Sequence, residues 1–129
     1  MTTDLWMLVW TALLSLFFFL TYGLGRMRLP GGIPWAFGNR ETEIAGPPWV
    51  ERAVRAHHNL VENIGPFAIL VLVAHVSGHA NATTAFGASL FFWARVGHAA
   101  TYIAGILYVR TAMFALATLG ELMILAQLC

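Results

Sequence analysis

Polar side chains recur at every third or fourth position in one segment near the middle of the chain. They are Arg52, Arg55, Asn59 and Glu62. At 100° per residue this spacing confines them to one face of a helix, within about 90° of arc. Guanidinium groups bind carboxylates through two parallel hydrogen bonds and keep their charge away from water. This face is therefore a candidate receptor for an anionic ligand.

A second polar stripe lies further along the chain and consists of Arg95, His98 and Tyr102. Their spacing of three and four also gives one helix face, and we expect the two faces to meet inside a bundle. An unpaired charge deep in a membrane helix costs about 2.5–3.5 kcal/mol, so each charge there needs a partner. We therefore expect Glu62 to pair with Arg95 or Arg55.

Arginine outnumbers acid in this set, because one carboxylate cannot neutralise Arg52, Arg55, Arg95 and Arg110 together. Arg110 and Thr111 open the last apolar segment, where free backbone N–H groups add partial positive charge. They could stabilise a bound thiolate and lower the pKa of a ligand thiol from its ordinary value of about 8.5. The alternative is that Arg110 extends to lipid headgroups.

The composition indicates that lipid surrounds these residues. The chain has 129 residues, of which 59% are apolar and 10% charged, whereas about 25% of residues are charged in soluble domains. A helix needs about 20 apolar residues to cross a bilayer, so the length allows four crossings with short connections. The net charge is only +1, and we expect no nucleic-acid partner.

The hydropathy pattern predicts a single all-α domain over residues 1–129, an integral membrane four-helix bundle. The helices are expected at about 5–25, 49–77, 82–104 and 108–128. Residues 29–48 hold four of the five prolines and predict a loop at the membrane surface. Pro66 falls inside the second helix, where it removes one backbone hydrogen bond and favours a kink.

The arginines also predict the orientation of the bundle. Arg26, Arg28, Arg40, Arg52 and Arg55 flank the first long connection, whereas the 78–82 turn and both termini carry none. The positive-inside rule then makes that connection cytoplasmic. We expect a bacterial inner membrane protein with both termini on the non-cytoplasmic side and its site near the cytoplasmic face.

No metal site is expected. Cys129 is the only cysteine, and His75 and His79 have a ligand-like spacing of four but lack a third ligand. Glu121, the one acid in the last helix, is expected to contact another helix or subunit.

Two motifs resemble the signature of one membrane family. They are VERAVRAHHNLVENIGPF at residues 50–67, and RVGH at residues 95–98 followed by Tyr102 and Arg110-Thr111. The sequence is similar to the membrane-associated proteins in eicosanoid and glutathione metabolism, the MAPEG family. It lies nearest to the microsomal prostaglandin E synthase and microsomal glutathione transferase branches.

The resemblance implies a homotrimer that binds glutathione between subunits near the cytoplasmic face. By resemblance, Arg55, Asn59, Glu62, His98 and Tyr102 line the glutathione site, and Arg26 reaches in from the neighbouring subunit. Arg52 and Arg95 join the candidate binding set from the polar stripes described above. The candidate catalytic residues are Tyr102, Arg110 as thiolate stabiliser, and Thr111, where the synthase branch has serine.

The expected function is that of a glutathione-dependent transferase or peroxidase for small lipophilic electrophiles or hydroperoxides that arrive from the membrane lipid. The alternative is a non-catalytic lipid-binding or scaffold protein on the same fold. A small multidrug transporter also fits the length, but such proteins need a carboxylate in the first helix, and residues 5–24 contain none.

Overall fold

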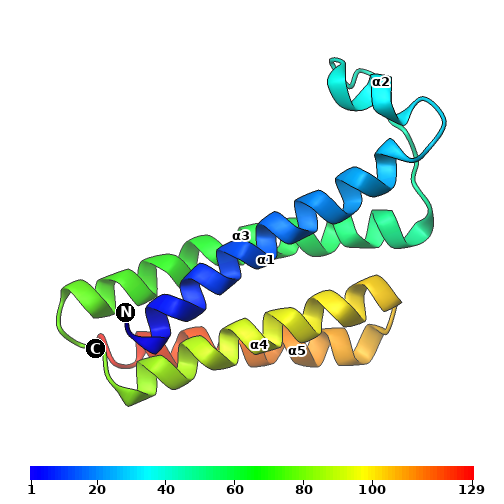
Figure 1. Ribbon diagram of the computed structural model, residues 1–129. Coiled ribbons are helices and arrows are strands. Elements are labelled where there is room, and N and C mark those ends of the chain that lie inside the picture. The colour runs from blue at the N-terminus through cyan, green and yellow to red at the C-terminus, as the bar shows by residue number, and fades with distance from the viewer.

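Five helices and no strand make up the chain in the computed structural model, which describes residues 1–129 (Figure 1). The helices are α1 (Thr3–Met27), α2 (Gly32–Phe37), α3 (Pro48–Val76), α4 (Ala82–Ala104) and α5 (Leu107–Leu125). The all-α membrane fold expected from the sequence is confirmed. Residues 126–128, expected in the last helix, form a turn instead.

The outer surface of the bundle is apolar. Large side chains such as Phe17, Ile69 and Leu122 are exposed on it, as expected where lipid is the solvent. Three helices, α1, α3 and α5, are long and apolar enough to cross a bilayer. The chain is thus an integral membrane protein, although only three of the four expected spans qualify on hydropathy alone.

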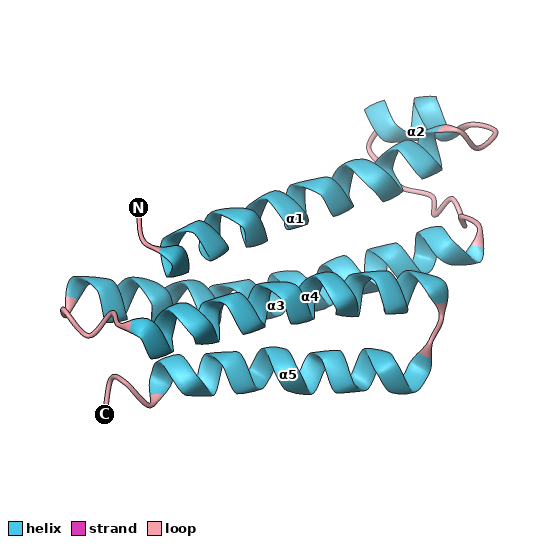
Figure 2. Ribbon diagram, turned by 60° about the horizontal axis from the view of Figure 1, so that its bottom comes forward, coloured by secondary structure: helices cyan, strands magenta, loops and turns pink.

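The remaining long helix, α4, owes its lower hydropathy to polar residues that face the interior. Thr84, Arg95 and His98 are buried, whereas Phe86 and Trp93 are exposed on the outer face. This helix lies at the centre of the fold and contacts α1, α3 and α5, while α1 and α5 lie on opposite sides of it (Figure 2). The interior position of α4 therefore explains why its composition differs from that of its neighbours.

The two ends of the bundle differ in what they carry. Both termini and the α3–α4 turn lie at one end, and α2 and the α4–α5 turn lie at the other (Figure 1). Gly105 ends α4 with a left-handed φ of 81°, which permits the tight turn into α5. One polar stripe lies in the first half of α3 and the other in the second half of α4. Both stripes are therefore nearer the end that carries α2.

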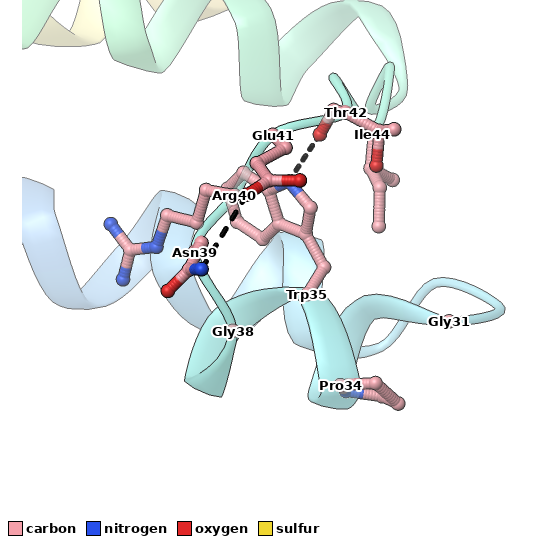
Figure 3. Close-up of a pocket in the computed structure, with 9 residues that line it drawn as sticks. All are labelled: Gly31, Pro34, Trp35, Gly38, Asn39, Arg40, Glu41, Thr42 and Ile44. Atoms are coloured by element: carbon pink, nitrogen blue, oxygen red, sulfur yellow. Dashed lines mark hydrogen bonds between the residues drawn. The ribbon is translucent and has the colours of Figure 1, made fainter.

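The connection between α1 and α3 contains the short helix α2, where the sequence predicted a loop. Its proline and glycine residues do not prevent one helical turn, because Gly31 adopts a left-handed φ of 75° as the N-cap. The indole of Trp35 reaches from α2 to the returning segment and donates to the Thr42 carbonyl oxygen at 2.6 Å (Figure 3). The guanidinium groups of Arg26 and Arg40 lie 5.5 and 5.2 Å from the Trp35 ring centroid.

Helix α3 begins at a proline pair and continues without interruption through Pro66 to Val76. Proline is well tolerated in the first turn, where its missing N–H would have no partner in any case. Further along α3, Phe67 stacks on Phe91 of α4 with 3.9 Å between ring centroids. This stacked pair belongs to the larger apolar cluster that α3, α4 and α5 share.

Helices α4 and α5 approach closely at a pair of glycines. A Cβ atom on Gly120 would lie 2.5 Å from the Gly87 carbonyl oxygen and 2.9 Å from the Phe91 nitrogen. A Cβ atom on Gly87 would lie 2.7 Å from the Gly120 carbonyl oxygen. Small residues are common at such contacts in membranes, because they let two backbones pack directly.

We expect Gly120→Ala to destabilise the protein by about 1–3 kcal/mol, the usual cost of overpacking a close contact. The measurement is thermal unfolding in detergent. Gly65→Ala is the matched control, because a Cβ atom there would meet nothing within 4 Å and alanine favours helix. Equal melting temperatures for Gly120→Ala and Gly65→Ala would contradict the close α4–α5 contact.

Candidate functional site

A pocket of about 320 Å³ opens between α3, α4 and α5 near the end that carries α2. Its lining combines hydrogen-bonding, aromatic and cationic side chains: Asn59, His98, Tyr102, Arg110, Thr111 and Phe114. Five of these six were expected from the sequence, and the fold brings them together from three helices. No carboxylate is among them.

Behind the pocket lies Arg95, the largest fully buried side chain, which is only 2% exposed. Its Nη2 atom donates to Asn59 Oδ1 at 2.9 Å, which joins α4 to α3. Its Nε and Nη1 atoms have no hydrogen-bond partner. The buried Arg95 guanidinium therefore holds the side-chain amide of Asn59, one of the residues that line the pocket.

The expected ion pair between Glu62 and an arginine is not formed. The single salt bridge of the chain joins Arg26 and Glu51 at 3.2 Å, and Glu62 is exposed on α3. Asn59 lies nearly one turn before Glu62 and occupies the position that faces Arg95. The prediction failed because helical spacing identifies a shared face but not which member of that face points inward.

Aromatic rings hold the pocket's cation and imidazole in place. The Arg110 guanidinium carbon lies 4.4 Å from the centroid of the Tyr102 ring, a favourable cation–π distance. The His98 ring packs edge-on against Tyr102 with 5.5 Å between centroids, and it also contacts Phe114. Arg110 is thus packed over Tyr102 inside the pocket.

The charge of the pocket follows from these contacts. Arg110 lines it, Arg95 lies directly behind Asn59, and no acid is among the lining residues. In a low-dielectric surrounding such charges act more strongly than they do in water. The arrangement favours an anionic group bound beside Arg110.

Arg52 has a structural role in the fold. Its Nε atom donates to the Ile103 carbonyl oxygen at 2.7 Å, and its guanidinium lies beside Gly105. The last carbonyls of a helix lack partners and carry partial negative charge, which a cation satisfies. Arg52 therefore caps the C-terminus of α4 and does not line the pocket.

Three other candidate residues lie outside the pocket of a single chain. Arg55 and Glu62 are exposed on α3. Arg26 lies at the junction of α1, α2 and α3, where its Nη2 atom donates to both carboxylate oxygens of Glu51. Within one chain these three side chains do not join the residues around Arg110.

Two features were missed by the sequence reasoning. Phe114 lies four positions after Arg110, and this helical spacing on one face could have identified it. His57 is half-buried between α1 and α3. Its two ring nitrogens lie 2.9 Å from Ser15 Oγ and 3.1 Å from Tyr22 Oη, so this histidine joins α1 to α3.

Comparison with known proteins agrees with this fold. The model of the MAPEG family matches residues 6–129, which is nearly the whole chain. The family consists generally of glutathione-dependent membrane enzymes. No curated protein matches the sequence. On the family match, this chain belongs to the MAPEG family.

Proposed function

We propose that the protein is a glutathione-dependent membrane transferase or peroxidase that acts on small lipophilic electrophiles or hydroperoxides. The observation that carries this proposal is the cationic pocket, in which Arg110 is packed over Tyr102 with no acid in the lining. Membership of a family of generally glutathione-dependent enzymes supports the same proposal.

Glutathione is a tripeptide with two carboxylates, one amine and one thiol, and the candidate residues supply partners for one carboxylate, the amine and the thiol. Arg55 would bind a carboxylate and Glu62 the amine, because both project from α3 beside Asn59. His98 and Tyr102 would form the pocket wall beside the peptide. Arg110 and Thr111 would hold the sulfur, where a neighbouring cation favours the thiolate.

The chemistry then follows from a stabilised thiolate. With an aryl halide, the sulfur forms a bond to carbon, the halide leaves with the bonding electrons, and the thiol proton passes to water. With a hydroperoxide, the sulfur attacks the terminal oxygen and the O–O bond breaks, which gives an alcohol and an oxidised sulfur. A second glutathione reduces that sulfur, so that glutathione disulfide and water are formed.

Exposed charges on α3 support a contact with a neighbouring subunit, such as the homotrimer implied by the family resemblance would provide. Glu62 lies about 21 Å from the start of α3 at 1.5 Å per residue, near the middle of this 29-residue helix, where a charge facing lipid is costly. A neighbouring subunit that covered this face would remove the exposure and could bring its Arg26 to the site. The positive-inside rule places that site near the cytoplasmic face, and the substrate would enter from lipid past the half-exposed Phe114.

A second candidate function is lipid binding without catalysis on the same fold. The hydroxyl of Thr111 donates to the Leu107 carbonyl oxygen of its own helix at 3.3 Å, so its proton is directed away from the pocket. Glutathione binding without turnover over a broad panel of electrophiles and hydroperoxides would select this alternative.

We expect Arg55→Ala and Glu62→Ala each to weaken glutathione binding by about tenfold, the worth of one charge-assisted hydrogen bond. Isothermal titration of the purified protein in detergent measures this change. Arg28→Ala is the control, because Arg28 is an exposed arginine beyond α1 and outside the pocket. Unchanged affinity in both α3 variants would remove them from the binding site.

We expect Arg110→Ala to lower kcat for aryl halide conjugation by about a hundredfold, the usual effect of removing one group that stabilises developing or bound negative charge. The thiolate absorbance of bound glutathione should fall as well, because the cation favours the ionised thiol. Turnover and thiolate absorbance equal to those of the parent protein would show that Arg110 is not the thiolate stabiliser.

A further inference from the structure

A second cavity, of about 520 Å³, lies where the last turns of α1 meet α2 and the start of α3. It shares no lining residue with the pocket around Arg110. Its volume is within the usual range for small-molecule sites, and most of its lining residues are hydrophobic. This cavity is therefore a separate candidate binding site, at the end of the bundle that carries α2 (Figure 1).

The lining of this cavity changes from apolar to polar along its length. Phe19 and Leu20 line it from α1, and Phe19 lies about 12 Å along the helix from the last residue, Met27, at 1.5 Å per residue. Arg40 and Glu43 line it from the connection that follows α2. Because α1 is long and apolar enough to cross the bilayer, the apolar end lies among acyl chains and the polar end at the headgroups. A ligand that fits both ends is an amphiphile oriented like a membrane lipid.

The polar end of the cavity carries charges of both signs. The charged lining residues are two arginines and two glutamates: Arg26, Arg40, Glu43 and Glu51. Arg26 and Glu51 form the single salt bridge of the chain, so each neutralises the other. Arg40 and Glu43 are exposed and have no ionic partner. They offer one cation and one anion to a ligand that carries the opposite pair.

The chemistry of these two free groups favours an ethanolamine headgroup. Arg40 uses one N–H on the Ala36 carbonyl oxygen, at 3.3 Å, and its other donors suit a phosphate. The Glu43 carboxylate only accepts hydrogen bonds, so it suits an ammonium group that has N–H donors. Choline has no such donors and binds to open aromatic faces instead, but Trp35 already has the guanidinium groups of Arg26 and Arg40 against its ring.

We propose that this cavity binds a phospholipid with an ethanolamine headgroup. Arg40 binds the phosphate, Glu43 binds the ammonium group, and an acyl chain packs along Phe19 and Leu20 of α1. An anionic lipid without an ammonium group would place its negative charge near Glu43 and leave that acid unpaired. The site is independent of the proposed function, because the lipid binds whether or not the pocket around Arg110 catalyses a reaction.

Native mass spectrometry of the detergent-purified protein tests the lipid preference. Phosphatidylethanolamine, phosphatidylcholine and phosphatidylglycerol with identical acyl chains are added in turn. We expect one phosphatidylethanolamine per chain, bound about tenfold more tightly than the other two lipids, the worth of one charge-assisted hydrogen bond. Equal binding of all three would show non-specific contact with the protein surface and would overturn the proposal. Glycerophosphoethanolamine, which has no acyl chain, should not bind, and binding as tight as that of the lipid would contradict a lipid ligand.

Charge variants test the two headgroup contacts separately. Glu43→Gln should abolish the preference for phosphatidylethanolamine over phosphatidylglycerol, because the acid that binds ammonium and repels anionic lipid is gone. Arg40→Gln should weaken the binding of both lipids by about tenfold, because both carry a phosphate. Glu41→Gln and Arg28→Gln are the controls, since these exposed residues do not line the cavity. An unaltered preference in Glu43→Gln, or unchanged affinity in Arg40→Gln, would overturn the proposed headgroup contacts.

A bulkier side chain inside the cavity tests its location without changing charge. Gly23 lines the cavity, and a Cβ atom there would meet nothing within 4 Å, so Gly23→Leu can fold while it fills the apolar end. Phosphatidylethanolamine should raise the melting temperature of the parent protein, because a ligand stabilises the state that it binds. It should not raise that of Gly23→Leu. The control is Gly65→Leu, since Gly65 is equally unobstructed and lies outside the cavity. Equal shifts in Gly23→Leu and the parent protein would overturn the assignment of the lipid to this cavity.

Discussion

The hydrogen bond between Arg95 and Asn59 is the constraint on which the rest of the bundle depends. A guanidinium that is 2% exposed loses nearly all of its hydration, and the bonding amide returns only part of that energy. The bond holds α3 and α4 together at one level of the bundle. Apolar clusters lie along both helices around this level, with Phe67 and Phe91 in one and Leu60 in the other.

The helical bundle could be predicted from the sequence because lipid imposes a simple pattern on it. Long apolar segments and the meeting of the stripes on α3 and α4 follow from length and periodicity. The short helix α2 could not be predicted, since its fold depends on the left-handed Gly31 and on the contact between Trp35 and Thr42. Local sequence signals for one turn among prolines and glycines are weak.

The candidate site could be predicted only in part. Helical spacing placed Asn59 and Glu62 on one face, but a face of about 90° includes both interior and edge positions. Packing decides between them, so that Asn59 meets Arg95 while Glu62 stays exposed. Arg52 does not line the pocket for a related reason. Its guanidinium binds the Ile103 carbonyl oxygen at the end of α4, which has no partner within the helix.

A structure determined with an S-alkyl glutathione bound tests the central claim most directly, namely that a cationic pocket supported by Arg95 receives an anionic thiol peptide. The account predicts that the ligand sulfur lies beside Arg110 and Tyr102. It also predicts that Arg95 remains hydrogen-bonded to Asn59 and that no protein carboxylate is paired with Arg95. A ligand seated elsewhere, or an Arg95 paired with a carboxylate and detached from Asn59, would contradict the account.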